Sequence, residues 1–471
     1  LRIQDGQLVI GTALGPVVER IPLAYQVIAG RQVPVSCGYR LKNGRIGYAL
    51  GPYDPRHELI IDPTLEFSTY SGATTDNFGY TATFDDLGFL YSGSSSFGSG
   101  YPTTIGAYQT TWNGGDGQGT IVGTDMAITK YDTSGTFLVW STMLGGQGDD
   151  LPHSLIVNAN DEVFILGTTG SPDHPVSTGA FQPTFAGGST YTPQGIGVSY
   201  PSGSDMLVAR LSADGSQLLA ATFLGGTQND GHNSAPALKF NYADEMRGEI
   251  LLDDAGRVIV MSCTQSSDYP VSPNAAQTGF GAGTHDGVIT KLTSDLGSLV
   301  WSTFLGGGNA DAVFGGELFA NGDLLICGGT NSTDLPVTSN AYQGSYQGGL
   351  ADAFAARLSA DGSTVQACTF YGSNAYDQAY FADLDDQQNV FLFGQTQAPV
   401  GQLILNAPYN VPNGGQFIAK LSPDLQSWVL GSRFGLANGT PSISLTLRGF
   451  SREDRSARRP LRGPVRSNAL C

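Results

Sequence analysis

Acidic side chains recur at one place in a repeated pattern, shortly after a glycine-containing turn. Carboxylates gathered on one face of a protein could bind Ca²⁺, a hard cation that takes several oxygen ligands. The alternative role is local, because Asp in a turn commonly accepts backbone N–H hydrogen bonds and caps the turn. We favour the local role and expect no cofactor, so these residues are weak candidates for metal ligands. They are Asp76, Asp149, Asp230, Asp311 and Asp377.

The histidines and cysteines form no recognisable site in the sequence. No H-x-x-x-H or H-E-x-x-H pair occurs, so a histidine metal site or catalytic pair would need tertiary contacts. The five cysteines stand singly, without a C-x-x-C pair, and predict neither a zinc site nor a disulfide framework. We expect them to be small buried side chains. The histidines are His57, His153, His174, His232 and His285; the cysteines are Cys37, Cys263, Cys327, Cys368 and Cys471.

Other catalytic patterns are absent or incomplete. "SADGS" at 212–216 and 359–363 is similar to the Asp box of sialidase propellers, but its glycine spacing differs and that box is structural. A sialidase-like site also needs clustered arginines and a tyrosine beside a carboxylate. "NGGDGQG" at 113–119 lacks the regular Asp spacing and closing Glu of a calcium loop. No nucleophile elbow, phosphate loop or dinucleotide fingerprint occurs. We therefore expect no catalytic residue.

The segments that must position these residues form a repeat. Within each period, an apolar hairpin such as "ANGDLLICGGT" (320–330) precedes a Pro loop such as "LPVTSNAYQ" (335–343) and a strand such as "DAFAARLSADG" (352–362). Four short strands per repeat are typical of a β-propeller blade. The repeats start near Phe67 ("FSTYSG"), Trp140 ("WSTMLGG"), Ala220 ("AATFLGG"), Trp301 ("WSTFLGG"), Ala367 ("ACTFYGS") and, as a worn fragment, Gly431 ("GSRFG").

The pattern predicts an all-β propeller. One four-stranded sheet cannot cover both its faces, whereas blades packed around an axis bury a continuous core. We expect the "WSTFLGG" strand to lie near that axis, and six or seven blades in the complete protein. Helical repeats would need apolar residues at i, i+3, i+4 and i+7, and no such stretch exists. The period is short for an array of independent β-sandwiches.

The chain divides into three parts on this basis. Residues 1–63 do not follow the repeat and predict a small β module, with "KNGR" (42–45) as a hairpin turn. Residues 64–446 hold the propeller repeats. Residues 447–471 carry seven arginines against two acidic residues and show no alternation. We expect this tail to be disordered and non-native, and both ends of the chain to be incomplete.

Charge and hydropathy limit the classes of partner. The formal net charge is −18, which argues against nucleic-acid binding because such proteins present a basic surface. No apolar run is long enough for a membrane span. Extra length lies in residues 112–124, 183–204 and 239–249, and long loops on one face of a repeat array are where binding usually occurs.

The repeat resembles the SBBP β-propeller repeats of bacterial secreted and cell-surface proteins. The resemblance rests on "WSTFLGG" with Asp311, on "GDLLICGGTNSTDLPVTSNAYQ" (322–343) and on "DAFAARLSADG", and it covers about residues 64–435. The stretch from "ERIPLAYQ" (19–26) to "LIIDPTLEFSTYSG" (59–72) resembles the module that often precedes these repeats. In Bacteroidota, the resemblance implies surface proteins associated with gliding motility and type IX secretion.

Together these features favour a non-enzymatic, secreted or cell-surface propeller that binds a protein or glycan ligand on one face, as in adhesion. The rival is a glycan-acting hydrolase or lyase that uses the central channel. Two carboxylates with an Arg or Tyr facing the channel would favour the enzyme, whereas a lining of Ser, Thr and Gly would favour binding. The sequence leaves the ligand and the oligomeric state open.

Overall fold

The structure is a computed structural model that describes residues 2–436, except 5, 13–14, 20, 43–44, 63–70, 241 and 408, together with Arg466 and Ser467. It divides into two compact units: residues 1–69 with 449–461, and residues 70–448 with 462–471. Both units are built from β-strands, and the described residues contain only two short 3₁₀ helices, η1 (Pro236–Leu238) and η2 (Tyr242–Glu245).

The N-terminal unit contains three small antiparallel sheets. In the middle of one of them, the Gln26 side chain is buried and holds the loop before β8. Its Nε2 donates to the carbonyl oxygens of Asp54 (2.7 Å) and His57 (2.9 Å), and its Oε1 accepts from Asp54 N–H at 2.8 Å. The sheets are β1 (Arg2–Gln4), β2 (Gln7–Thr12) and β3 (Gly15–Glu19); β5 (Arg31–Val35), β4 (Leu23–Ile28) and β8 (Leu59–Asp62); and the hairpin β6 (Cys37–Lys42) and β7 (Arg45–Leu50).

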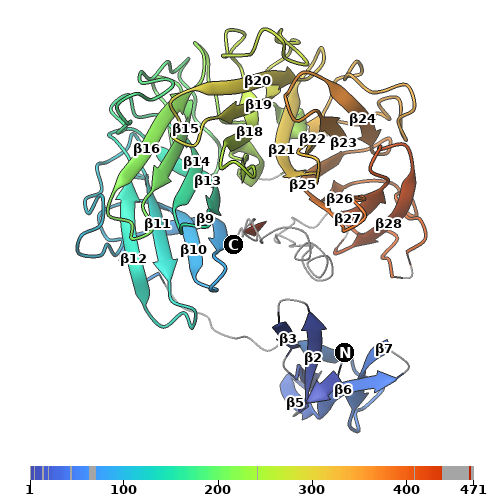
Figure 1. Cartoon of the computed structure of the whole chain (residues 1–471). Coiled ribbons are helices and arrows are strands. Elements are labelled where there is room, and N and C mark those ends of the chain that lie inside the picture. Colours follow the sequence, from blue (N-terminus) through green and yellow to red (C-terminus); the bar gives the residue numbers. More distant parts are fainter. Residues whose placement is uncertain are drawn as a thin grey trace. The chain divides into compact units, whose positions relative to one another are not determined.

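The described part of the second unit contains five antiparallel sheets, which we call blades 1 to 5; each has four consecutive strands, and β29 (Arg466–Ser467) adds a fifth to the sheet of blade 1 (Figure 1). Blade 1 comprises β9 (Asn77–Phe84), β10 (Leu90–Ser96), β11 (Asp125–Tyr131) and β12 (Leu138–Leu144). Blade 2 comprises β13 (Asp150–Val157), β14 (Val163–Thr169), β15 (Asp205–Leu211) and β16 (Leu218–Leu224). Blade 3 comprises β17 (Glu249–Leu252), β18 (Val258–Thr264), β19 (Asp286–Leu292) and β20 (Leu299–Leu305). Blade 4 comprises β21 (Asp311–Leu318), β22 (Leu324–Thr330), β23 (Asp352–Leu358) and β24 (Val365–Tyr371). Blade 5 comprises β25 (Asp377–Leu384), β26 (Val390–Thr396), β27 (Gln416–Leu421) and β28 (Trp428–Phe434).

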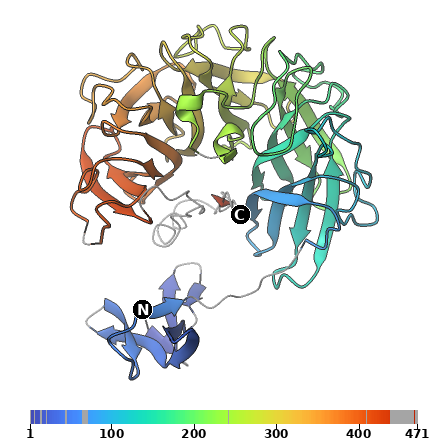
Figure 2. The ribbon, with the colours of Figure 1, turned by 180° about the vertical axis from the view of Figure 1, so that it is seen from behind.

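The all-β propeller arrangement is as predicted, but the radial order of the strands is not. The first strands of successive blades contact one another, so β9, β13, β17, β21 and β25 lie innermost. The "WSTMLGG" and "WSTFLGG" segments form β12 and β20, the outermost strands (Figure 2). Their expected place near the axis was wrong, because Gly-Gly leads from the outer edge of one blade to the inner strand of the next. The fragment at Gly431 lies in β28 and completes the fifth sheet.

Tryptophan fixes two of the contacts between blades. Trp301 Nε1 donates to the carbonyl oxygen of Ala360, in a turn of the next blade, at 3.1 Å. Trp140 Nε1 donates likewise to Ala213 at 2.8 Å. A Cβ on Gly362 would stand 2.5 Å from the Trp301 ring, and φ is +73° at this position, so the turn requires glycine here. Core clusters of buried apolar side chains connect each blade to the next in the chain.

Each blade also carries one ion pair between its third strand and the turn that joins its first two strands. The side chains are mostly buried, and the basic residue often lies over an aromatic ring, as Arg357 lies 4.1 Å from the centroid of Phe319. These pairs therefore hold basic groups in the body of the blades. They are Lys130–Asp85, Arg210–Glu162, Lys291–Asp253, Arg357–Asp323 and Lys420–Asp385.

The tail predicted over residues 447–471 lies outside the described residues apart from β29 (Arg466–Ser467). The backbone of β29 pairs antiparallel with Ala82 and Thr83 of β9. Among the residues that the structure describes, no helix is long and apolar enough to cross a membrane.

Candidate functional site

Asp311 and Asp377 begin the inner strands β21 and β25, and Asp230 forms an isolated bridge with Thr264; each of these three recurring carboxylates holds the turn that precedes it. Asp311 shows the pattern: its Oδ2 accepts from Gly307 N–H at 2.7 Å and Ser332 Oγ at 2.8 Å, and its Oδ1 accepts from Thr330 Oγ1. Asp230 and Asp377 make the same kinds of contact in their own blades. All three residues are fully buried. Their oxygens therefore cap turns and connect two strands.

In the first two blades the equivalent position is one residue later than the sequence alignment placed it. Asp150 pairs with Thr169 as Asp311 pairs with Thr330, and the first blade has Asn77 opposite Ser96. Asp76 is exposed. Asp149 is buried and organises two long loops, because it accepts from the backbone N–H groups of Thr124 (2.7 Å), Gly117 (3.0 Å) and Ser199 (2.6 Å).

In blades 2 to 5, a second carboxylate from the start of the third strand of the preceding blade faces this position. It faces it across a Gly-Gly turn at Asp150, Asp230 and Asp311, and across Gly372-Ser373 at Asp377. A Cβ on Gly306 would stand 2.8 Å from Asp286 Oδ1 and 2.9 Å from Asp311 Oδ2. The same geometry explains the glycines at 145 and 225, where a Cβ would also meet two carboxylates. The sequence "LGG" therefore recurs in this chain because the backbone at its glycines passes between two buried carboxylates. The pairs are Asp125/Asp150, Asp205/Asp230, Asp286/Asp311 and Asp352/Asp377.

Among the described residues, no basic side chain forms an ion pair with these eight carboxylates. Burial raises the pKa of Asp286 to about 7 and that of Asp352 to about 8. Burial likewise raises the pKa of Asp311 to about 6. Uncompensated buried carboxylates bind protons more tightly than exposed ones. Within the described parts of the chain, no group of three or more His, Cys, Asp or Glu is arranged to hold a metal ion.

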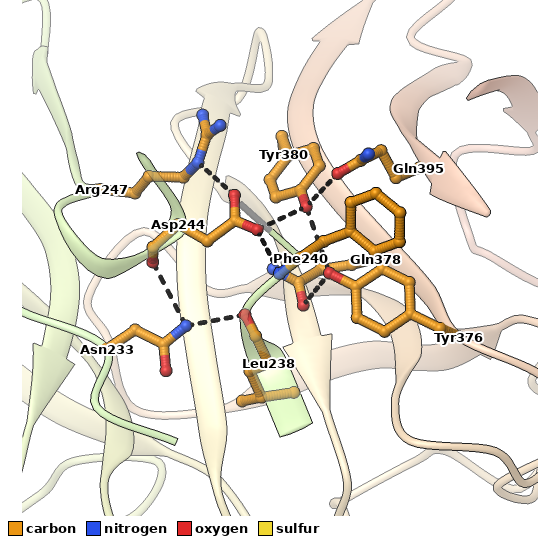
Figure 3. A network of polar contacts seen from close by, with 9 residues as sticks. All are labelled: Asn233, Leu238, Phe240, Asp244, Arg247, Tyr376, Gln378, Tyr380 and Gln395. Atoms are coloured by element: carbon orange, nitrogen blue, oxygen red, sulfur yellow. Dashed lines mark hydrogen bonds and ion pairs between the residues drawn. The ribbon is translucent and has the colours of Figure 1, made fainter. Parts of the chain in front are cut away.

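The densest polar network lies elsewhere, on an insertion in blade 3 between Asp230 and β17 (Figure 3). Asp244 of this insertion is fully buried. Its Oδ1 lies 3.1 Å from Arg247 Nε, and its Oδ2 accepts from Phe240 N–H at 2.8 Å and from the Tyr380 hydroxyl at 3.1 Å. Tyr380 lies on β25, so the carboxylate connects the insertion of blade 3 to the inner strand of blade 5.

The network continues on the blade 5 side through tyrosine and glutamine. The Tyr380 hydroxyl lies 2.7 Å from Gln395 Oε1 and 3.2 Å from the Tyr376 hydroxyl, which donates to Gln378 Oε1 at 3.0 Å. The Arg247 guanidinium lies over the Tyr380 ring, 4.3 Å from its centroid. Figure 3 shows these side chains converging from two blades on Asp244.

A second half of the insertion contacts blade 2. Glu245 lies 2.6 Å from Lys239 Nζ and accepts from the Tyr191 hydroxyl at 2.9 Å. Glu249, at the start of β17, accepts from Ser154 Oγ of β13 at 2.6 Å. The insertion is therefore fixed to blades 2 and 5 as well as to its own blade.

This cluster meets the composition that the sequence argument set for an enzyme, since it brings two carboxylates together with arginine and tyrosine. Its environment is not that of an activated group. Asp244 and Glu245 are buried and each bonds a basic side chain. Burial raises the pKa of Tyr376 and of Tyr380 well above the usual value, which opposes formation of a nucleophilic phenolate. The arrangement fits a structural role, in which the cluster fixes the blade 3 insertion to blades 2 and 5.

Sequence reasoning singled out residues 239–249 as extra length but gave no role to Asp244, Glu245 or Arg247. The signal available was the local density of charge in "ADEMR", within a chain in which charged residues make up only 14%. Tyr376 and Tyr380 gave no signal, because the insertion that they contact is far away in the chain.

Three of the histidines lie near this network but form no metal site. His153, His232 and His285 are buried, and burial lowers the pKa of each to about 3, so they are neutral. The His232 ring stacks on Tyr191, with centroids 4.1 Å apart. His174 is also buried, and His57 lies in the N-terminal unit. Cys263, Cys327 and Cys368 are buried free thiols, and Cys37 is partly exposed; Cys471 lies outside the described residues.

This structural role gives a measurable prediction at Tyr191. Replacing Tyr191 with Phe removes the hydroxyl that bonds Glu245 but keeps the ring on His232. We expect the free energy of unfolding to fall by about 1.5 kcal/mol, the usual contribution of a hydrogen bond to a charged group. Denaturant unfolding measures this value. The same change at Tyr409, which is 72% exposed, serves as the control and should alter stability little.

Comparisons with known proteins leave the function open. Residues 1–64 match a domain family of unknown function, DUF7948. No curated protein sequence matches the chain. Similar solved structures include a protein of unknown function from Dyadobacter fermentans, with 12% identity, a TM-score of 0.37, and coverage of 79% of this chain and 89% of that one.

Two enzymes are also among the similar solved structures. A xylan β-1,4-xylosidase from Bacillus halodurans has 12% identity and a TM-score of 0.31, with 74% of this chain and 53% of that chain covered. A GH43_1 enzyme from Xanthomonas citri has 11% identity and a TM-score of 0.30, with 69% and 85% covered. Because these TM-scores are below 0.5, the likenesses support no conclusion about this chain.

Proposed function

We propose that the chain is a non-enzymatic propeller that binds a protein or glycan ligand through the long loops of blades 1 to 3. The supporting observation is the way these loops are held. Asp149 accepts hydrogen bonds from Gly117 and Thr124 in one loop and from Ser199 in the next. Loops fixed in this way lose little entropy when a ligand binds.

The exposed rim of these loops has neutral binding chemistry. Residues 118–122 and 189–195 expose hydroxyl, amide and glycine groups, and Ile121 and Val122 are about half exposed. Hydroxyl and amide groups beside a small apolar patch can form hydrogen bonds and apolar contacts with a glycan or a polypeptide. The internally paired carboxylates of the blade 3 insertion are, by contrast, not available to a ligand.

Secretion or display on the cell surface, and membership of the SBBP repeat proteins with a link to gliding motility, belong to the same proposal. Their support is the sequence resemblance described above. A strongly acidic, glycine-rich repeat array with loops on one face suits an extracellular binding role.

The test is binding of the full chain to glycan and protein arrays. We expect a ligand whose affinity falls at least about tenfold when Ile121 and Val122 are both replaced with Ser, with no change in unfolding temperature. Ile105→Ser is the matched control, because Ile105 is fully exposed in a different loop. An equal loss of affinity in the control, or no hit in either array, would contradict the proposal.

The cluster at Asp244 is the observation that favours one alternative function, that of a hydrolase or lyase that acts on a polysaccharide. A panel of polysaccharides tests it directly, with product release as the readout. Turnover that is abolished by Asp244→Asn, while the variant keeps its fold by circular dichroism, would support the enzyme and overturn the binding proposal.

A further inference from the structure

In blades 1 to 4, one face of each sheet packs on the following blade, and we call this the forward face. On blade 4 it includes Leu325 and Cys327 of β22 and Ala355 of β23. These side chains share a core cluster with Val390 and Leu392 of blade 5. The forward face of an internal blade is therefore apolar and fully covered.

Blade 5 has apolar side chains at the corresponding positions. Cys327 pairs with Ala355 across β22 and β23, just as Phe393 pairs with Ile418 across β26 and β27. By this register, Leu325 corresponds to Phe391. The Phe393 ring stacks between two further rings of the same face, with its centroid 5.8 Å from those of Phe381 and Phe434. The forward face of blade 5 is thus built like that of an internal blade.

No described blade packs on this face, on which Phe391 and Ile418 are partly exposed and Phe393 is buried. Among the described strands, none of β9–β12 forms an extended contact with any of β25–β28, and Figures 1 and 2 show blades 1 and 5 apart. Blade 1 would also be a poor match. It has Ser92 and Ala127 at the positions where blade 5 presents Leu392 and Phe417 to blade 4.

At the contact between blades 4 and 5, an aromatic side chain from a loop of blade 4 packs on blade 5. The corresponding side chain of blade 5 itself is exposed. Tyr342 of blade 4 donates its backbone N–H to Leu425 O of blade 5 at 2.9 Å, and its ring packs against Trp428. The backbone N–H of Thr338 bonds the fourth strand of blade 4, and that of Leu405 bonds the fourth strand of blade 5. Tyr342 and Tyr409 each lie four residues further along the chain, so Tyr409 of blade 5 corresponds to Tyr342 of blade 4. Tyr409 is 72% exposed.

We propose that the forward face of blade 5 is the docking surface for a sixth four-stranded blade of the same repeat, carried by the same polypeptide. The four internal contacts show the chemistry of the occupant, which is a sheet with aliphatic side chains where blade 5 has Val390 and Leu392. A second copy of the chain and direct closure onto blade 1 are the other ways to cover this face.

The experiment compares the full chain with an extended chain in which a duplicate of residues 374–436 is inserted after Leu436. Ile418→Asp is made in the original copy of both. In the extended chain we expect the substitution to shift the folding equilibrium constant toward unfolding by about tenfold or more, because a charge would enter an apolar contact. In the full chain we expect a change of about twofold or less. Ile418→Ala, a milder change, repeats the comparison if the Asp variant does not fold.

Three results would overturn the proposal. A small effect in both chains would show that the face does not receive a blade. A large effect in both, with a monomer by light scattering, would show closure onto blade 1. A large effect in both, with a dimer that Ile418→Asp dissociates, would assign the face to a second copy. Leu87→Asp, at a 72% exposed position in a turn of blade 1, is the control and should act weakly in both chains.

Discussion

Replacing Asp244 with Ala is expected to lower the free energy of unfolding by about 3–5 kcal/mol, the usual cost of removing one partner of a buried ion pair. The substitution leaves the Arg247 guanidinium, whose side chain is 9% exposed, without its carboxylate. It also removes the acceptor for Phe240 N–H and a partner of the Tyr380 hydroxyl. The loss should appear in denaturant unfolding followed by tryptophan fluorescence.

Two further variants make this result specific. Asp244→Asn keeps an acceptor oxygen but loses the charge, so we expect it to be intermediate. Asp86→Ala removes an exposed carboxylate and should change stability by less than about 0.5 kcal/mol. If Asp244→Ala cost less than about 1 kcal/mol, the network would not be what holds the insertion between blades 3 and 5.

The second large effect is a loss of stability between pH 7 and pH 9. Burial raises the pKa of Asp125 and of Asp352 to about 8, from an ordinary value of 3.8. The folded state therefore holds these protons at a pH at which the unfolded state has released them. Stability from each group is fully present below pH 4 and is lost as the pH rises through 8. Each should contribute a loss of about 1.4 kcal/mol between pH 7 and pH 9.

Other buried groups also change the free energy of unfolding with pH. The pKa values of Asp150, Asp205 and Asp286 are raised to about 7, so these residues add smaller losses above pH 7. The lowered pKa values of the buried histidines act in the opposite direction and only below pH 6.5, where the unfolded state gains protons that the folded state cannot hold. Below pH 6.5 the carboxylates and the histidines therefore act in opposite directions, whereas above pH 6.5 only the raised pKa values of the carboxylates lower the stability.

Unfolding in denaturant at a series of pH values measures this profile. Asp352→Asn removes one titrating group that faces Asp377 and should flatten the decline above pH 7. Asp361→Asn is the control, because Asp361 is exposed and hydrogen bonds within its turn hold its pKa at about 2. Stability that is constant or rises from pH 7 to pH 9 would show that the facing carboxylates are ionised in the folded protein.

The sequence was sufficient to predict the blades but not their radial order. Period, glycine turns and alternation define four strands in each sheet, and these signals are local. Inner and outer strands have similar apolar runs: β13 is buried throughout, and β12 is buried in five of its seven residues. The distance of a strand from the axis follows from contacts between blades, which no local pattern records.

The candidate site could not be predicted from the sequence for a related reason. Asp244 and Tyr380 are 136 residues apart in the chain and meet only because the insertion of blade 3 extends to the inner strand of blade 5. The acidic positions were recognised by type, but two adjacent acids at 149 and 150 concealed which of them starts the strand. The turn-capping role of the recurring Asp followed from residue chemistry alone, whereas its facing partner required the fold.

The four consecutive strands of each blade come from one uninterrupted stretch of chain, and the two-residue β29 adds to the edge of blade 1 beside β9. Duplication or deletion of a whole blade-length gene segment would therefore leave no strand without its neighbours in the sheet. The length of such an array can change in evolution by single recombination events, each adding or removing one intact sheet and one set of loops. A single molecule pulled from its ends should likewise extend in discrete steps, one blade at a time.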